Sequence, residues 1–213
     1  MNVRIKICGV RSLADVEACV RAGVDMVGFN FWPGSQRYIP PGEATALVKA
    51  LPPSILPVGV FVQAAPQALF AACRVSGVTL AQLHGDEDPA LYVGSPVALM
   101  QVIRVPADAT AASLRAPRTP IALLDSRVKE FGGQGQPFHW ALAAEAHRLW
   151  QTPVIIAGGL HPQNVRGAIL MARPFGVDVA SGVESSPGVK DADKVMEFVA
   201  EVRAAEIEGD RHG

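Results

Sequence analysis

Cysteine is scarce in this chain, and its positions exclude two common structural roles. Of 213 residues, only Cys8, Cys19 and Cys73 are cysteines. They are odd in number, and none stands at the short spacing of a metal-binding pair. The pattern therefore predicts reduced thiols in a cytoplasmic protein, with no disulfide framework and no cysteine metal site.

The chain also lacks long apolar runs and an excess of charge of either sign. No stretch approaches the ~18 apolar residues that span a bilayer, and the opening Met-Asn-Val-Arg-Ile-Lys has no apolar signal segment. The formal net charge of −1 gives no electrostatic reason to bind nucleic acid or an anionic membrane. With 49% hydrophobic and 18% charged residues, the composition is that of a soluble globular protein with neither kind of partner.

A glycine-rich turn of the type G-x-G-x-x-G is missing after the first strand-like run, which ends in Cys8-Gly9-Val10-Arg11. This disfavours a doubly wound open sheet, the main competitor among parallel α/β folds. Apolar, β-branched runs instead alternate with helical patterns along the whole chain, and parallel strands require such crossovers. Eight units in this length predict a single (β/α)8 TIM barrel. The strands are expected at 3–8, 24–31, 56–62, 78–83, 98–105, 121–124, 154–157 and 177–180.

The helical segments are less uniform than the strands. Ser12 is a suitable N-cap for a helix that stops near Gly23, and a short helix is expected at 86–91. The segment 106–118 carries only a weak helical pattern, so the fifth helix is expected to be degenerate. The barrel domain is expected to span 1–205 and to close with a helix at 191–205, followed by a frayed tail at 206–213. The glycine-rich loop at 132–135 fits either a lid or a plain connection.

Two late strands end in small residues, which is a pattern typical of phosphate binding. One ends in Gly158-Gly159 and the other in Ser181-Gly182. Small residues let an anion approach backbone N–H groups closely, and a helix N-terminus after the strand adds a favourable dipole. The two endings together predict one phosphate cup.

The ends of strands one and six carry the strongest candidates for acid and base catalysis. Active sites of such barrels lie at the carboxyl ends of the strands. Cys8 ends the first strand near Lys6, whose positive charge is expected to lower the thiol pKa from about 8.5 toward neutrality. Asp125 ends the apolar run 121–124, where it acts either as a turn residue or as a general acid; the apolar run favours the acid.

Three further polar residues at strand ends are candidates for binding. Arg37, in the loop after the second strand, is either solvated or a two-pronged carboxylate ligand. Asp178, inside the eighth strand, is expected to bind a ligand hydroxyl or a neighbouring side chain because an unpaired carboxylate there is costly. His84 is a weaker candidate. Glu184 and Lys190 are interpreted as parts of a surface loop.

Taken in order, these segments resemble the phosphoribosylanthranilate isomerase family over nearly the full length. The matching segments are Lys6-Ile-Cys8-Gly9, Gly34-Ser-Gln-Arg37-Tyr38, Gln82-Leu-His84-Gly85-Asp86-Glu87, Leu123-Leu-Asp125-Ser126, Ala157-Gly-Gly-Leu160 and Val177-Asp178-Val-Ala-Ser181-Gly182-Val-Glu184. Each is weak alone, and together they are specific. One departure bears on the cup: Ala180 stands where the family often has serine.

The resemblance implies an Amadori rearrangement of a phosphoribosyl substrate in tryptophan biosynthesis. By the family pattern, Cys8 is the general base, Asp125 the general acid and Arg37 the anthranilate ligand. Asp178 and His84 would contact the substrate, and the two small-residue turns would hold its phosphate. No metal or organic cofactor is expected, since proton transfers alone complete the reaction. The family includes monomers and homodimers, and both remain open here.

Two alternatives remain open. The first is the related Amadori isomerase of histidine biosynthesis, or a form accepting both substrates; Cys8 argues against the former, because that family has an aspartate at this position. The second is a phosphate-binding barrel without catalysis, which the presence of both Cys8 and Asp125 disfavours.

Overall fold

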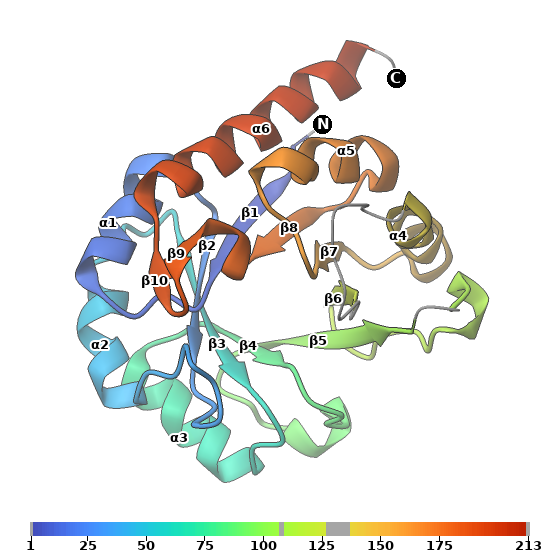
Figure 1. Cartoon of the computed structure of the whole chain (residues 1–213). Coiled ribbons are helices and arrows are strands. Elements are labelled where there is room, and N and C mark those ends of the chain that lie inside the picture. The colour runs from blue at the N-terminus through green and yellow to red at the C-terminus, as the bar shows by residue number, and fades with distance from the viewer. Residues whose placement is uncertain (1, 107–108, 127–136, 212–213) are drawn as a thin grey trace.

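The computed structural model describes residues 2–106, 109–126 and 137–211 of the chain, and within them it forms a closed parallel barrel (Figure 1). The strands run in the order β1-β2-β3-β4-β5-β6-β7-β8, and β8 pairs with β1 to close the ring. Their bounds are β1 Arg4–Cys8, β2 Met26–Asn30, β3 Leu56–Phe61, β4 Leu80–Leu83, β5 Ala98–Val105, β6 Ile121–Ser126, β7 Val154–Ala157 and β8 Gly176–Val179. The predicted (β/α)8 barrel is confirmed.

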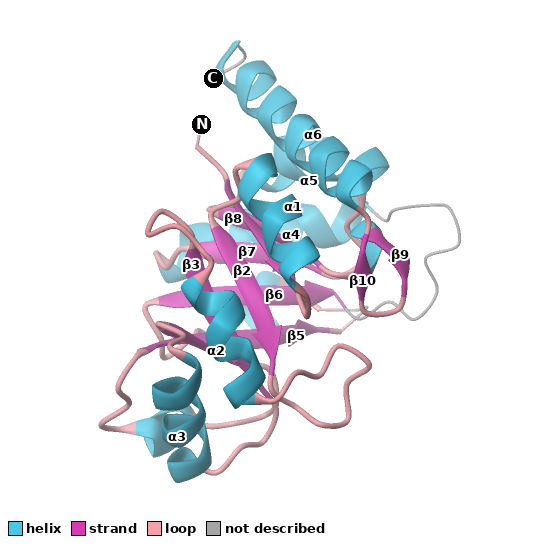
Figure 2. Cartoon of the chain, turned by 90° about the vertical axis from the view of Figure 1, so that its left-hand side faces the viewer, coloured by secondary structure: helices cyan, strands magenta, loops and turns pink. Residues whose placement is uncertain are grey.

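Helices cover the outside of this barrel, as the side view in Figure 2 shows. They are α1 Leu13–Ala22, α2 Pro41–Lys49, α3 Pro66–Ser76, α4 Pro137–Trp150, α5 Pro162–Ala172 and α6 Ala192–Arg211. The expected start of α1 is confirmed: the Ser12 hydroxyl accepts from the Asp15 N–H, and the Asp15 carboxylate accepts from the Ser12 N–H. Gly23 ends the helix in the left-handed conformation, at φ 72°.

In the described residues, two units of the barrel have short 3-10 turns in place of a helix. After β5 comes η2 (Ala111–Ser113), which confirms the degenerate fifth helix. After β4 the expected helix at 86–91 is wrong in extent, because η1 covers Pro89–Tyr92. The Asp88 carboxylate accepts from the Ala90 N–H, and Pro89 occupies the first turn, so the helical turn begins only there.

The chain after β8 also differs from the prediction. A 3-10 turn, η3 (Ser181–Val183), leads into an antiparallel pair, β9 (Glu184–Ser186) and β10 (Val189–Lys190), before α6 begins. The last helix continues to Arg211, so the expected end at 205 is wrong. Glu206 accepts from the Val3 N–H and from Arg203, which ties this part of α6 to the start of the barrel. The glycine-rich 132–135 segment lies outside the described residues.

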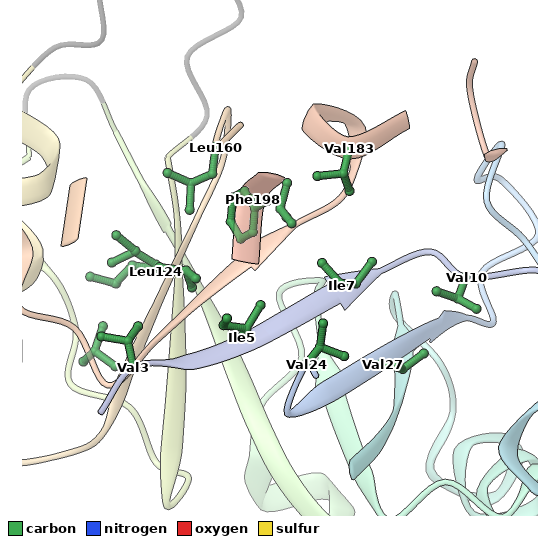
Figure 3. Packing of buried hydrophobic residues seen from close by; sticks show 14 of the residues in the cluster. Val3, Ile5, Ile7, Val10, Val24, Val27, Leu124, Leu160, Val183 and Phe198 are labelled. Carbon is green, nitrogen blue, oxygen red and sulfur yellow. The ribbon is translucent and has the colours of Figure 1, made fainter. Parts of the chain in front are cut away.

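The alternation of side chains along each strand separates two apolar layers. Ile5 and Ile7 of β1 belong to the large cluster between barrel and helices, together with Phe198 of α6 (Figure 3). A second cluster fills the barrel interior: Met26, Val58, Leu80, Met100, Val102, Leu123 and Ile155. Since successive strand residues face opposite sides, Lys6 and Cys8 point into the barrel. The interior is thus apolar in one layer and polar in the layer toward the carboxyl ends of the strands.

Candidate active site

A cavity of about 330 Å³ opens at the carboxyl ends of the barrel strands. Eight of the nine predicted site residues line it: Cys8, Arg37, His84, Asp125, Gly158, Gly159, Asp178 and Ser181. The ninth, Gly182, directly follows Ser181. The eight residues come from six strands or the loops after them, which is how a barrel gathers distant parts of a chain into one site.

Cys8 lies at the edge of this cavity, with 9% of its surface exposed. Lys6 lies two residues before it, fully buried, and its Nζ donates a 2.8 Å hydrogen bond to Asp178 Oδ1 of β8. Burial raises the pKa of the Cys8 thiol above its ordinary value, and the nearby charge of Lys6 opposes this only in part. The charge of Lys6 thus acts in the expected direction, but burial outweighs it, so the pKa of the thiol is raised.

Asp125 and His84 face each other from β6 and the end of β4, with Asp125 Oδ2 3.4 Å from His84 Nε2. The other ring nitrogen of His84 lies 2.8 Å from the amide of Gln82, a fully buried residue of β4. Arg104 of β5 donates to the His84 carbonyl oxygen at 2.9 Å. The histidine is thus held on both sides and presents one nitrogen to the carboxyl of Asp125.

The guanidinium of Arg37 is fixed by Glu184 of β9, although 25% of the side chain is exposed. Arg37 Nε and Nη2 donate to the two carboxylate oxygens at 2.6 and 2.7 Å. Lys190 Nζ of β10 donates to Glu184 Oε1 at 2.9 Å and to the Ala180 carbonyl oxygen at 3.0 Å. Both Glu184 and Lys190 are 8% exposed, so their assignment to a surface loop is wrong.

The electrostatics of this cluster keep Glu184 ionised. Burial by itself would raise the pKa of its carboxyl, but the hydrogen bonds from Arg37 and Lys190 hold it below the ordinary value. The hydrogen bonds that Arg37 donates to Glu184 correspondingly raise the pKa of Arg37. The β9–β10 pair therefore serves to place one carboxylate beside the arginine of a distant loop.

The two small-residue strand endings lie side by side at the cavity. Gly158 and Gly159 have φ of 90° and 68°, a region that a side chain would strain. A Cβ built on Gly182 would collide with the carbonyl oxygen of Leu160, so only glycine lets the turn after β8 pack against the turn after β7. The two turns therefore pack as closely as the predicted phosphate cup requires, although η3 rather than a long helix follows β8.

Several residues that line the cavity or support it are missed by the sequence prediction. Asn30, Trp32, Ser35 and Arg104 line the cavity, and Lys6 lies directly beneath it. Arg104 could have been found, since a charged residue near the end of an otherwise apolar strand carries the same signal as Asp125. Asn30 is likewise a polar residue at the end of an apolar strand, β2. Trp32 and Ser35 lie in the loop after it, which has no spacing signal.

No described residues form a cluster of three or more histidine, cysteine, aspartate or glutamate side chains able to hold a metal ion. No described helix is long and apolar enough to cross a bilayer.

Comparison with known proteins gives a consistent match over almost the whole chain. The model of the N-(5'-phosphoribosyl)anthranilate isomerase family matches residues 5–201. The chain belongs to this family of isomerases. The isomerase of Myxococcus xanthus is 43% identical over 211 residues, which cover 97% of this chain and 99% of that protein.

Solved phosphoribosylanthranilate isomerases share the fold closely. The Thermotoga maritima enzyme superposes with a TM-score of 0.84 at 35% identity, covering 95% of this chain and all of that one. A phosphoribosylanthranilate isomerase complex with reduced 1-(o-carboxyphenylamino)-1-deoxyribulose 5-phosphate gives a TM-score of 0.81 at 32% identity, with coverage of 95% and 100%. Another Thermotoga maritima structure, with a TM-score of 0.77 at 31% identity and coverage of 95% and 99%, shows monomers generated from a dimeric isomerase. Whether this chain is a monomer or a homodimer stays a prediction.

Proposed function

We propose that this protein converts N-(5-phospho-β-D-ribosyl)anthranilate to 1-(2-carboxyphenylamino)-1-deoxy-D-ribulose 5-phosphate, the isomerase step of tryptophan biosynthesis. The observation that carries the proposal is the meeting of Cys8 and Asp125 in one cavity, from β1 and β6, beside a fixed arginine and two glycine turns. Membership of the isomerase family supports the same reaction.

The chemistry needs one acid and one base. Asp125 protonates the furanose ring oxygen, the C1′–O bond breaks, and the anilino nitrogen lone pair forms a Schiff base with C1′. The Cys8 thiolate then removes the C2′ proton, and the electrons of that bond give an enolamine, which tautomerises to the ketose. A positioned acid or base contributes about 10²–10⁴-fold in rate.

The remaining cavity residues bind the two ends of the substrate. Arg37 retains donors beyond the two used by Glu184, and it holds the anthranilate carboxylate. Asp178 and His84 contact the sugar as it opens. The turns at Gly158-Gly159 and Ser181-Gly182 hold the 5′-phosphate through backbone N–H groups, and Ala180 offers no hydroxyl to it.

Genetic complementation tests the reaction directly. The gene is introduced into a tryptophan auxotroph that lacks this isomerase and, in parallel, into a histidine auxotroph that lacks the related Amadori isomerase. We expect growth without tryptophan and no growth without histidine. Rescue of neither strain would remove the enzymatic proposal, and rescue of both would show that the cavity accepts two phosphoribosyl substrates.

The pairing of Glu184 with Arg37 gives a test of substrate positioning. Glu184→Gln removes the charge that fixes the guanidinium, and hydrogen bonds to charged groups are worth about 1.5–3 kcal/mol. We therefore expect KM to rise about tenfold or more, with a smaller change in kcat. Glu208→Gln is the matched control, since Glu208 accepts two hydrogen bonds from Arg166 on the outer helices. An unchanged KM in Glu184→Gln, measured by steady-state kinetics, would contradict this role.

A further inference from the structure

Lys6 is the largest fully buried side chain in the described part of the chain, and it needs an explanation beyond packing. Lysine is almost never fully buried unless it is paired, because taking its ammonium out of water is costly. Lys6 Nζ donates to Asp178 Oδ1 at 2.8 Å, and its charge also acts on the thiol of Cys8, two residues further along β1. The ammonium is thus close to both a carboxylate and the thiol proposed as the base.

The neighbouring strand is shaped to permit this contact. Gly28 of β2 pairs with Cys8 in the barrel register. A Cβ on Gly28 would lie 3.0 Å from Cys8 Sγ and 3.2 Å from Lys6 Nζ, so both side chains would have to shift by a few tenths of an ångström. Glycine at this position therefore leaves the space in which ammonium and sulfur meet.

The other charged groups near Cys8 already have ion-pair partners. Lys190, whose charge also acts on the Cys8 thiol, is bound by Glu184, and Glu184 is bound in turn by Arg37. These three groups form one cluster, with both lysine and arginine sharing a single carboxylate.

Asp15 lies beyond Lys190 and serves the backbone instead. Its carboxylate accepts from the N–H groups of Arg11, Ser12 and Lys190. Lys6 borders the same space beside Gly28 as the Cys8 sulfur, so it is the cation placed to balance a negative charge there.

We propose that Lys6 is a positioning residue that stabilises the Cys8 thiolate, and that Asp178 competes with the sulfur for its ammonium. The inference rests on the proposed function of Cys8 as base. It adds a link to substrate binding: a sugar hydroxyl that donates to Asp178 weakens the hold of this carboxylate on Lys6. The ammonium is then freer to bind the sulfur, so the base is activated when the substrate is in place.

The direction of each effect on Cys8 follows from the charges. Burial raises the pKa of the thiol, the ammonium of Lys6 lowers it, and the carboxylate of Asp178 raises it. Replacing the lysine by a neutral residue and replacing the aspartate by asparagine must therefore change the reactivity of Cys8 in opposite directions. If Lys6 and Asp178 served only to hold the fold, both substitutions would instead change the reactivity of Cys8 in the same direction.

Thiol alkylation measures this without turnover. Iodoacetamide is added across a pH series to a Cys19→Ala, Cys73→Ala background, in which Cys8 is the remaining thiol, and modification is followed by mass spectrometry. Because one pKa unit is a tenfold change in thiolate below the pKa, we expect Lys6→Met to slow alkylation at fixed pH about tenfold or more. Asp178→Asn should accelerate it, and Lys6→Arg should restore part of the rate.

The outcomes separate this inference from the proposed function. Equal alkylation profiles in all variants, or changes of the same sign in Lys6→Met and Asp178→Asn, would overturn the role of Lys6. If Lys6→Met fails to fold by circular dichroism, the acceleration in Asp178→Asn and the rate in Lys6→Arg still decide the matter. A Cys8→Ala enzyme with normal turnover would remove the proposed base while leaving the charge relation among the three side chains measurable.

Discussion

Replacing Cys8 by alanine is expected to lower kcat about 10²–10⁴-fold, because no other described group at the cavity edge stands in the place of the thiolate. Steady-state kinetics on the purified variant, with anthranilate fluorescence as the signal, give the value. Cys19→Ala is the matched control. Cys19 is also buried but lies on α1 outside the cavity, and burial raises its pKa to about 12.

A loss of turnover in Cys8→Ala must be distinguished from a loss of the site. We expect this variant to bind reduced 1-(o-carboxyphenylamino)-1-deoxyribulose 5-phosphate, the molecule held by a structural relative, with little change in affinity by calorimetry. The alanine removes one sulfur from the edge of the cavity and leaves the glycine turns and Arg37 in place. Near-normal kcat in Cys8→Ala would show that another group removes the C2′ proton.

The sequence predicted the barrel because its strands are apolar on both faces and recur at regular intervals. It also predicted which residues share a cavity, since a parallel barrel brings all strand ends to one face. Cys8 and Asp125 are 117 positions apart in the chain, and both line the same cavity. Their placement needed only the strand assignment and the polarity of the strand ends.

The support of these residues could not be predicted in the same way. Glu184 and Lys190 look like exposed loop residues in the sequence, because the short β9–β10 pair has no apolar alternation. Only the folded chain shows Glu184 accepting two hydrogen bonds from Arg37, 147 positions away. Secondary-structure propensities describe residues that are neighbours along the chain. This contact instead depends on how the loop after β2 meets the β9–β10 pair in the folded protein.

For the same reason, the net direction of the pKa shift at the Cys8 thiol could not be predicted from the sequence. The sequence places Lys6 near Cys8, and charge alone would lower the pKa. Burial, which acts against the thiolate, depends on β2 and β8 on either side, and Asp178 adds a negative charge from the last strand. The sequence correctly places Lys6 near Cys8. The balance between burial, the charge of Lys6 and the charge of Asp178 can be judged only from the closed barrel.

Asp125→Asn is expected to lower kcat by a similar ~10²–10⁴-fold, because an amide cannot supply the proton that opens the furanose ring. Asp193→Asn is the matched control, since Asp193 is exposed on α6 and is not among the residues that line the cavity.

If Asp125 acts at ring opening and Cys8 at removal of the C2′ proton, a substrate deuterated at C2′ distinguishes the two roles. In Cys8→Ala the deuterium effect on kcat should be fully expressed, because removal of that proton limits the rate. In Asp125→Asn the deuterium effect should approach unity, because ring opening then limits the rate and breaks no C–H bond. A large deuterium effect in both variants would place Asp125 at the same step as Cys8 and overturn the assignment of the acid.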